Sequence, residues 1–394
     1  MSNQKTLIKV PSRVVSSISI LALSLNLVAC GGAGNNTATN GDAGTGTGTE
    51  QGTEATGGES LAQKLALAQP VSVTGAGASF PAPLYQNWFV QLNQEVPDLR
   101  VDYQSVGSGA GVEQFIQGTV NFAASDVAMT DEEIAKVQRG VLMLPMTAGA
   151  IVLAYNIPGV EGELKLSRDV YTNILLGNIT NWNDPAIAEA NPDLQLPDLP
   201  ITVVHRADGS GTTGVFTKHL SAISPEWKET IGEGKTVEWP KKGKFIGAKG
   251  NEGVTASIQQ NQGAIGYVEY GYAKNNNLPM AALENQAGQF IKPTEESEMA
   301  TLDSVTLPED LRAFITDPEG DNSYPIVTYT WLLTYKQYDD PQIAKGIEGM
   351  IEYGLTTGQE SSAELGYIPL PPSVREKVAA AADQISPDYQ ITVE

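Results

Sequence analysis

Cysteine and histidine are almost absent from this sequence, which has one Cys and two His in 394 residues. So few ligands cannot assemble a zinc site of the Cys/His type. A single Cys also cannot close a disulfide within the chain. We therefore expect a fold without a structural zinc or a disulfide, and a protein that needs no metal and no cofactor.

Positive charge is scarce as well, because 24 Lys and Arg stand against 46 Asp and Glu and give a formal net charge of −22. No basic stripe is available to contact the phosphates of a duplex, so we expect no nucleic-acid partner. A small anion is not excluded, because it responds to local dipoles more than to net charge. With 41% hydrophobic residues, the composition is globular, and the length suffices for two domains.

The N-terminus has the pattern of an export signal. Three basic residues precede an apolar run at 14–29 that is typical of a signal sequence and not of a membrane-spanning helix. The run ends in "LVACG" (27–31), which resembles a bacterial lipobox. We expect a lipoprotein signal peptide over 1–29 and a protein exported to the periplasmic or cell-surface face of a bacterial membrane, where a lipid on Cys30 anchors it. The alternative is an ordinary secretory signal with an incidental Cys.

Residues 31–60 contain no apolar side chain larger than Ala. Such a stretch cannot bury enough surface to fold. As a flexible chain it has an end-to-end distance of roughly 30 Å for about 30 residues. We expect a lipid-anchored, Gly/Thr-rich linker over 30–70, with the folded part beginning near Val71.

From Val71 onward, short apolar runs alternate with stretches of helical spacing. The runs that predict strands are 71–75, 100–106, 120–126 and 201–208. The apolar residues that recur at helical spacing after three of them are Leu84, Trp88 and Leu92, then Val112, Phe115 and Ile116, then Val215, Phe216 and Leu220. This alternation predicts βαβ units and an α/β fold with a largely parallel sheet.

Two apolar runs, 141–157 and 325–335, are long for single strands. Each has the length to cross from one lobe to another. Two such crossings would form a hinged molecule, with lobe 1 at 71–147 and 329–394 and lobe 2 at 148–328. The alternative is one large sheet in which both runs are central strands, and spacing alone does not decide between the two.

Three turns rich in glycine and hydroxyl groups, at 74–83, 105–111 and 208–214, follow predicted strands and precede predicted helices. A helix start has unpaired N–H groups and a partial positive charge. Glycine lets the backbone approach a ligand, and a Ser or Thr hydroxyl adds a donor. Each turn is therefore a possible anion site, although for any one of them alone a capped helix start is the favoured explanation. Together, at the carboxyl ends of sheet strands, they favour one crevice.

Several enzyme motifs fail on inspection. "GEGKT" (232–236) has the end of a Walker A motif, but Glu229 stands where the motif requires its first glycine. Neither Ser108 nor Ser210 has a Gly two residues before it, so neither forms a nucleophile elbow. His205 beside Arg206 could be a general base, but the chain has only two His and we do not favour this role. We expect a protein that is not an enzyme.

Five segments together resemble one family. They are "TGAGASFPAPLYQNW", "YQSVGSGAG", "FAASD", "VVHRADGSGTTGVF" and "GAIGYVEYGYAKNNNLP", and they are similar to the phosphate-binding proteins of bacterial high-affinity ABC phosphate importers. The resemblance implies the type II periplasmic-binding-protein fold, two α/β lobes joined by two crossing hinge segments. It also implies inorganic phosphate as ligand and the membrane permease subunits of an ABC phosphate transporter as partner. We expect a monomer.

The family's ligand positions carry over by motif. The implied phosphate-binding residues are Ser79, Phe80, Ser108, Asp126, Arg206, Ser210, Gly211 and Thr212, and Asp208 resembles the residue that supports the arginine. The second turn has Gly-Ser-Gly where some relatives have Gly-Ser-Ser, which leaves the Ser108 position intact. The stretch 241–253 departs from the family pattern, so we assign it no contacts.

The chemistry of these residues suits a protonated oxyanion. The Arg206 guanidinium is a planar fork that binds two oxygens, which Asp208 can hold in place; an ion pair without a ligand role is the alternative. Asp126 repels anions unless the ligand carries a proton, as phosphate does and sulfate does not. Its alternative role is an N-cap for a helix that starts near Thr130.

Other functions stay open at this point. A receptor for sulfate or another tetrahedral oxyanion is disfavoured by Asp126. A secreted phosphatase lacks metal ligands and a nucleophile motif. An adhesin with the same fold is not excluded by any residue pattern.

The N-terminal pattern makes one testable prediction. Cys30→Ser removes the thiol that carries the lipid, so the protein should move from the membrane fraction to the soluble fraction. Phosphate titration of residues 61–394 is the control for an intact ligand site, because the linker should be dispensable for binding. Equal retention of the variant and the wild type in membranes would contradict the anchor.

Overall fold

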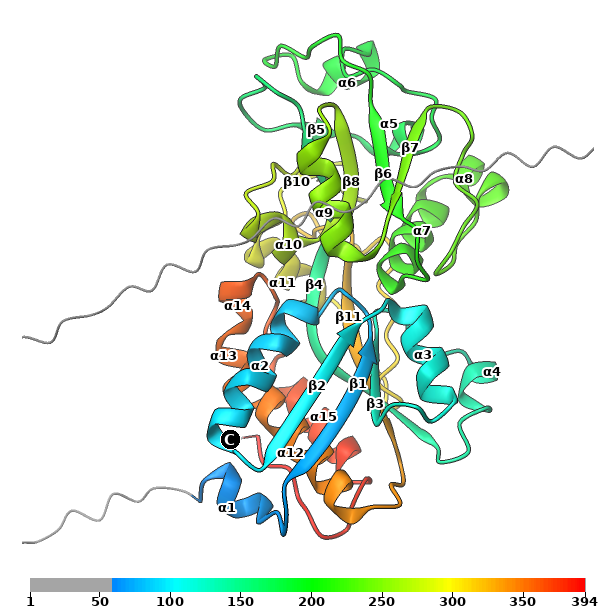
Figure 1. The fold of residues 1–394 in the computed structure, drawn as a ribbon. Coiled ribbons are helices and arrows are strands. Elements are labelled where there is room, and N and C mark those ends of the chain that lie inside the picture. Colours follow the sequence, from blue (N-terminus) through cyan, green and yellow to red (C-terminus); the bar gives the residue numbers. More distant parts are fainter. Residues whose placement is uncertain (1–58, 394) are drawn as a thin grey trace, which may run out of the picture. The chain divides into compact units, whose positions relative to one another are not determined.

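The computed structural model describes residues 59–393, and its centre is one mixed eight-stranded sheet (Figure 1). The strand order is β2-β1-β3-β11-β4-β8-β6-β7. Its strands are β1 (Val71–Gly77), β2 (Leu99–Ser105), β3 (Phe122–Ser125), β4 (Val141–Asn156), β6 (Thr202–Arg206), β7 (Lys244–Ala248), β8 (Ala264–Glu269) and β11 (Val327–Tyr335). The four strands predicted from the sequence correspond to β1, β2, β3 and β6, with ends shifted by a few residues.

Helices pack along this sheet, and the three predicted after strands are α2, α3 and α7. The helices are α1 (Leu61–Leu65), α2 (Ala82–Glu95), α3 (Ser108–Ile116), α4 (Asp131–Ile134), α5 (Arg168–Leu175), α6 (Pro185–Ala190), α7 (Gly211–Ile223), α8 (Pro225–Thr230), α9 (Gly250–Gln260), α10 (Tyr270–Asn275), α11 (Glu295–Asp303), α12 (Pro341–Leu355), α13 (Thr357–Glu360), α14 (Ser362–Leu365) and α15 (Pro372–Ala382). A small second sheet has the order β10-β9-β5 and consists of β5 (Lys165–Leu166), β9 (Ala282–Glu284) and β10 (Phe290–Ile291).

The expectation of a largely parallel sheet needs correction, because the sheet is mixed. β1 pairs in parallel with β2 and β3, and β6 pairs in parallel with β7 and β8. Between these two parallel groups, β11 and β4 run antiparallel to their neighbours. The two long apolar runs are these central strands, and both are buried along nearly their whole length.

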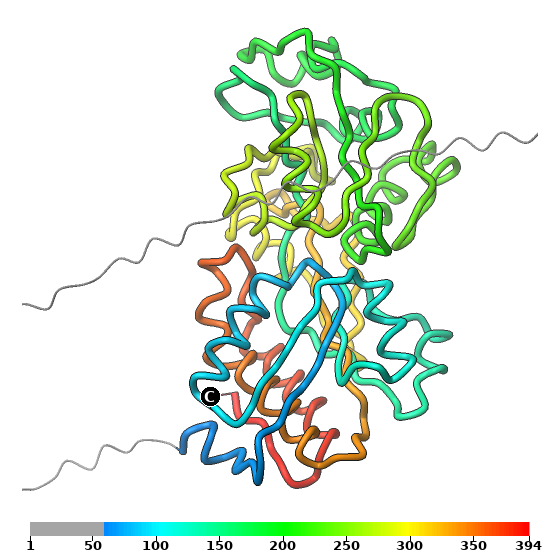
Figure 2. The backbone as a smooth tube through the Cα atoms, in the orientation of Figure 1, coloured from blue at the N-terminus to red at the C-terminus, as the bar shows by residue number. Residues whose placement is uncertain are grey.

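β4 changes its partner halfway along its length. Val141–Ala150 pairs with β11, in the register Val327↔Ala150, and Ile151–Asn156 pairs with β8. One strand therefore belongs to two groups. We call them the β1 part (β1, β2, β3, β11 and the first half of β4) and the β6 part (β6, β7, β8 and the second half of β4), each with the turns and helices that follow its strands. Figure 2 shows the blue-to-cyan and orange-to-red segments together around the β1 part, while most green segments lie around the β6 part.

The folded part starts earlier than Val71. Ser60 caps α1, and the apolar side chain of Leu65 is completely buried. Lys64 also forms an ion pair with Glu352 of α12 at 2.8 Å. The segment before Val71 is therefore folded from Ser60, because Leu61 and Leu65 end the stretch that lacks large apolar side chains. The predicted signal peptide, Cys30 and the linker up to residue 58 lie outside the described residues.

Candidate anion-binding site

Three strand-to-helix turns meet where the β1 part faces the β6 part. They join β1 to α2, β2 to α3 and β6 to α7. The Gly109 N–H donates to the Gly209 carbonyl at 2.8 Å. Gly107 has φ +91°, and a Cβ there would collide with the Asp208 carboxylate. Only glycine therefore permits this close approach of the second turn to the third.

Arg206 ends β6 with its side chain only 1% exposed. Its Nε and Nη2 donate to the two carboxylate oxygens of Asp208, at 2.8 and 2.6 Å. Nη1 is buried and has no hydrogen-bond partner among the described residues. Burial lowers the pKa of Arg206, but the hydrogen bonds and charge of Asp208 outweigh burial and leave that pKa raised. The guanidinium is therefore charged, and its Nη1 group can donate hydrogen bonds to a ligand.

Asp126 follows β3 and is only 2% exposed. Its Oδ1 accepts from Thr330 of β11 at 3.0 Å, and its Oδ2 accepts from Thr212 of α7, also at 3.0 Å. Burial raises the pKa of Asp126 to about 6, although the two hydroxyls and the charge of Arg206 act in the opposite direction. Above that pH the carboxylate is ionised, and it accepts hydrogen bonds from the Thr330 and Thr212 hydroxyls.

Ser79 lies within the first turn and contacts the β6 part directly. Its Oγ accepts from the backbone N of Asn251 at 3.0 Å and from Asn251 Nδ2 at 2.9 Å. The neighbouring Gly250 N–H donates to Asp208 at 3.1 Å. Both residues belong to the stretch 241–253, to which we assigned no contacts. Phe80 is completely buried, and its carbonyl accepts from Tyr367 at 2.7 Å.

The helix starts place further donors beside Asp126. Ser108 begins α3, and its Oγ accepts from the Asp126 N–H at 3.4 Å. Ser210 caps α7 by accepting from the Thr213 N–H at 3.0 Å. The amides of Gly211 and Thr212 occupy the first helical positions, where no intrahelical acceptor exists. A Cβ on Gly211 would collide with the Ser108 hydroxyl.

The structure therefore brings together all the residues that the motifs singled out for the ligand site. We call the following side chains the polar cluster: Ser79, Ser108, Asp126, Arg206, Asp208, Ser210, Thr212, Asn251 and Thr330. All except Asp208, whose side chain is 12% exposed, are buried. Sequence reasoning missed Asn251 and Thr330. The departure at 241–253 concealed Asn251, whereas Thr330 lies in a run that we interpreted only as apolar.

Thr130, His205 and Lys235 have structural roles outside the polar cluster. Thr130 caps α4 with its own hydroxyl, which accepts from the Glu133 N–H at 3.2 Å, so Asp126 is not that cap. His205 stacks on Trp239 at 4.7 Å, its Nδ1 lies 2.9 Å from the Arg206 carbonyl, and burial lowers its pKa. Lys235 of the "GEGKT" segment forms an ion pair with Glu133. Neither His205 nor Lys235 is part of the polar cluster.

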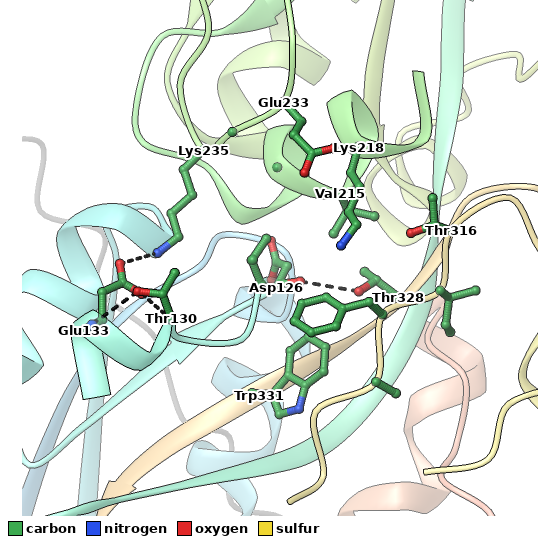
Figure 3. A pocket seen from close by; sticks show the side chains of 16 residues that line it. Asp126, Thr130, Glu133, Val215, Lys218, Glu233, Lys235, Thr316, Thr328 and Trp331 are labelled. Carbon is green, nitrogen blue, oxygen red and sulfur yellow. Dashed lines mark hydrogen bonds and ion pairs between the residues drawn. The ribbon is translucent and has the colours of Figure 1, made fainter. Parts of the chain in front are cut away.

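A pocket of about 380 Å³ lies beside Asp126 (Figure 3). Residues of both parts line it, and Asp126 is the one cluster residue among them. The hydroxyl of Thr328, another lining residue, lies 3.4 Å from the Asp126 carbonyl and 2.9 Å from the Tyr329 carbonyl. On one side the Lys235 ammonium meets the Glu133 carboxylate at 2.9 Å, which ties the β6 part to the β1 part. Asp126 is therefore the residue of the polar cluster that lies next to this pocket.

No group of three or more His, Cys, Asp or Glu side chains in residues 59–393 is placed to hold a metal ion. Within the same range, no helix has the length and apolar character needed to cross a bilayer.

The arrangement offers an anion specific hydrogen-bond donors rather than a net positive charge. It combines the Arg206 fork, which Asp208 holds, with several buried hydroxyls and the amides at the start of α7, and Asp126 is the buried carboxylate beside them. A family model described as a PBP superfamily domain matches residues 43–356. Fold and site together define a binding protein with the type II periplasmic-binding-protein fold, as the sequence predicted.

Curated relatives identify the family within this class of binding proteins. The phosphate-binding protein PstS of Pasteurella multocida is 44% identical over 315 residues, which cover 79% of this chain and 90% of the relative. PstS of Haemophilus influenzae is 43% identical, with coverage of 79% and 92%. PstS of Methanocaldococcus jannaschii is 37% identical, with coverage of 81% and 87%. The chain belongs to the family of PstS phosphate-binding proteins.

Solved structures agree at the level of the fold. A high-affinity periplasmic phosphate-binding protein bound with phosphate superposes with a TM-score of 0.66 at 19% identity, over 82% of this chain and 100% of that chain. The phosphate-binding protein of Stenotrophomonas maltophilia gives a TM-score of 0.63 at 21% identity, over 79% and 93%.

Proposed function

We propose that this protein binds inorganic phosphate at the polar cluster and delivers it to the membrane subunits of an ABC-type phosphate importer, without catalysing a reaction. The observation that carries the proposal is the Arg206 guanidinium, buried and charged, with Nη1 unpaired among the described residues. The PstS relatives and the phosphate-bound fold neighbour support phosphate as the anion. No observation favours a second function.

The proposed ligands divide into donors and one acceptor. The donors are the hydroxyls of Ser79, Ser108 and Ser210, the amides of Phe80, Gly211 and Thr212, and the Arg206 fork, while the Thr212 hydroxyl donates to Asp126. Each hydrogen bond to a charged group contributes roughly 1.5–3 kcal/mol. Four to six such bonds, less the cost of association and closure, support binding in the micromolar range or tighter.

Asp126 is the proposed basis of selectivity. Its oxygens are acceptors at neutral pH, so they favour a ligand with an O–H and repel one without it. A site built around a ligand hydroxyl can reject an analogue that lacks it by roughly 10⁴–10⁵. Phosphate retains an O–H near neutral pH and sulfate does not.

The proposed lobes are 71–147 with 329–394, and 148–328. Their boundaries lie close to the point where β4 exchanges β11 for β8, between Ala150 and Ile151. Contacts such as Gly109 to Gly209 and Lys235 to Glu133 would break when the lobes separate. The pocket beside Asp126 lies on this boundary and is the proposed route for the anion. Closure would also present a new surface to the permease.

We further propose that the chain is exported, acts as a monomer and is held at the membrane by a lipid on Cys30. The family supports export, since one fold neighbour is described as periplasmic. The lipid anchor rests on the "LVACG" motif alone.

Arg206→Ala tests the anion site. The variant loses the one charged donor and leaves Asp126 and Asp208 without their counter-charge, so phosphate affinity should fall by at least about 100-fold. Isothermal titration with phosphate measures the loss, and thermal unfolding checks that the variant is folded. The matched control is Arg168→Ala, because Arg168 makes a similar bidentate pair with Asp317 and contacts no cluster residue. Wild-type affinity in folded Arg206→Ala would refute the assignment.

Asp126→Asn tests selectivity. The amide can turn its NH₂ toward the anion, so sulfate affinity should rise on the order of 10- to 100-fold while phosphate affinity changes little. The quantity to measure is the ratio of the sulfate and phosphate dissociation constants. Asp102→Asn, which removes a charge from the exposed edge strand β2, is the control. An unchanged ratio in Asp126→Asn would place selectivity elsewhere.

The pH dependence of the same measurement has a defined sign. The pKa of Asp126 is raised to about 6, so below that pH the carboxyl is protonated and itself offers a donor. Sulfate affinity of the wild type should therefore rise as the pH falls through about 6. Asp126→Asn should lack this rise.

Solution scattering tests the lobes. Phosphate should reduce the radius of gyration of the wild type, because closure brings the two lobes together. Arg206→Ala at the same phosphate concentration is the control and should show no change. A constant radius in wild-type protein that calorimetry proves to be saturated would argue against a hinge.

A further inference from the structure

Asn251 is a buried residue through which the β6 part donates hydrogen bonds to Ser79 of the β1 part. It lies at the start of α9 in the β6 part and is 0% exposed. Its backbone N and its Nδ2 both donate to Ser79 Oγ of the β1 part, at 3.0 and 2.9 Å. Its Oδ1 accepts from the Glu269 backbone N–H at 3.0 Å.

The orientation of this amide follows from backbone chemistry. The Glu269 N–H is a donor only, so the amide oxygen of Asn251 must face it. The NH₂ group must then face Ser79. Neither direction depends on a rotatable hydroxyl, because Glu269 ends β8 and its N–H is fixed by the sheet.

The hydroxyl of Ser79 has two lone pairs and one hydrogen. Asn251 occupies both lone pairs with N–H groups. Among the described residues, Ser79 Oγ donates to no protein acceptor, and Tyr272 holds the Ser79 carbonyl at 2.7 Å. The hydroxyl hydrogen is therefore the one part of Ser79 left for a ligand.

We propose that Asn251 is a positioning residue that makes Ser79 an obligate hydrogen-bond donor to the bound anion. The inference rests on the proposed function, since it takes phosphate as the anion. The Glu269 N–H fixes the orientation of the Asn251 amide, and that amide in turn fixes the direction in which the Ser79 O–H donates. It requires both parts to be in contact, because Asn251 and Ser79 belong to different parts. Closure therefore sets the direction of this donor.

Asn251 thereby complements Asp126 within the cluster. Asp126 is fixed as an acceptor by its charge, and Ser79 is fixed as a donor by Asn251. Asn251 Nδ2 also lies 3.4 Å from Thr212 Oγ1, whose hydroxyl donates to Asp126. The amide therefore directs hydroxyls on two sides toward defined partners.

Asn251→Asp provides the test because it keeps the shape and replaces the donor Nδ2 with an acceptor oxygen. The Ser79 O–H should then turn toward residue 251 and away from the anion. Part of the resulting loss will come from the added negative charge. That part is separated from the hydroxyl effect by combining Asn251→Asp with Ser79→Ala and Ser79→Thr.

The measurement is the phosphate dissociation constant by calorimetry in all six combinations. Ser79→Ala alone should weaken binding about 10-fold or more. The additional loss caused by Asn251→Asp should be at least about fivefold larger with Ser or Thr at position 79 than with Ala. Equal losses in all three backgrounds would overturn the proposal and leave Asn251 as a packing residue. Failure of the proposed function would look different, because the wild type itself would then not bind phosphate.

Two further variants keep the test decisive. If Asn251→Asp does not fold, Asn251→Ala keeps only the backbone donor to Ser79, and a smaller loss that again requires a hydroxyl at position 79 is expected. Asn285→Asp is the matched control, because Asn285 is also completely buried and its Nδ2 donates to three carbonyls away from the cluster. It should lower stability and leave phosphate binding within about twofold in every background.

Discussion

A guanidinium that is buried in a chain with a net charge of −22 must keep a counter-charge within hydrogen-bonding distance, and Asp208 provides it for Arg206. The bidentate geometry uses Nε and Nη2 and leaves Nη1 with no partner among the described residues. An unpaired buried charge costs several kcal/mol, and a paired one costs far less. The pair therefore allows a positive charge to stand at the site without requiring a ligand to stabilise it.

Asp208 has a second function in the architecture. Besides Arg206, it accepts from the Gly250 N–H at the start of α9, and the glycine at position 107 leaves room for its carboxylate. One carboxylate thus contacts β6, α9 and the turn that begins α3. Asn251 follows directly after Gly250, so the ion pair also determines where the amide that contacts Ser79 lies. The Asp208 side chain therefore positions the charged donor Arg206 and, through Gly250, the neutral donor Asn251.

The central strands explain how two parallel groups share one site. β4 pairs with β11 up to Ala150 and with β8 from Ile151 onward, and Thr330 reaches Asp126 from β11 itself. Because the β1 part and the β6 part are connected through the same strand, the ends of their parallel strands face each other across a short span of backbone. A change of angle at that span would move whole turns and leave each turn internally intact.

Much of the site follows from local chemistry and was predictable from the sequence. Arg206 and Asp208 lie two residues apart at the end of a strand, so their pairing needs no knowledge of the rest of the fold. The glycines and hydroxyls of the three turns mark helix starts, whose unpaired amides bind anions in any context. The family motifs then identified Ser79, Ser108 and Asp126 as members of the same site.

Other features were decided by the tertiary structure alone. Thr330 contacts Asp126 across 204 positions of the chain, and Asn251 contacts Ser79 across 172. In a sequence, Thr330 is one polar residue within an apolar strand, and Asn251 is a polar residue in a departing loop. Their roles depend on which strand lies beside β3 and which helix start faces β1. Strand order and the antiparallel course of β4 and β11 result from packing across the whole sheet, and no local pattern of residues encodes them.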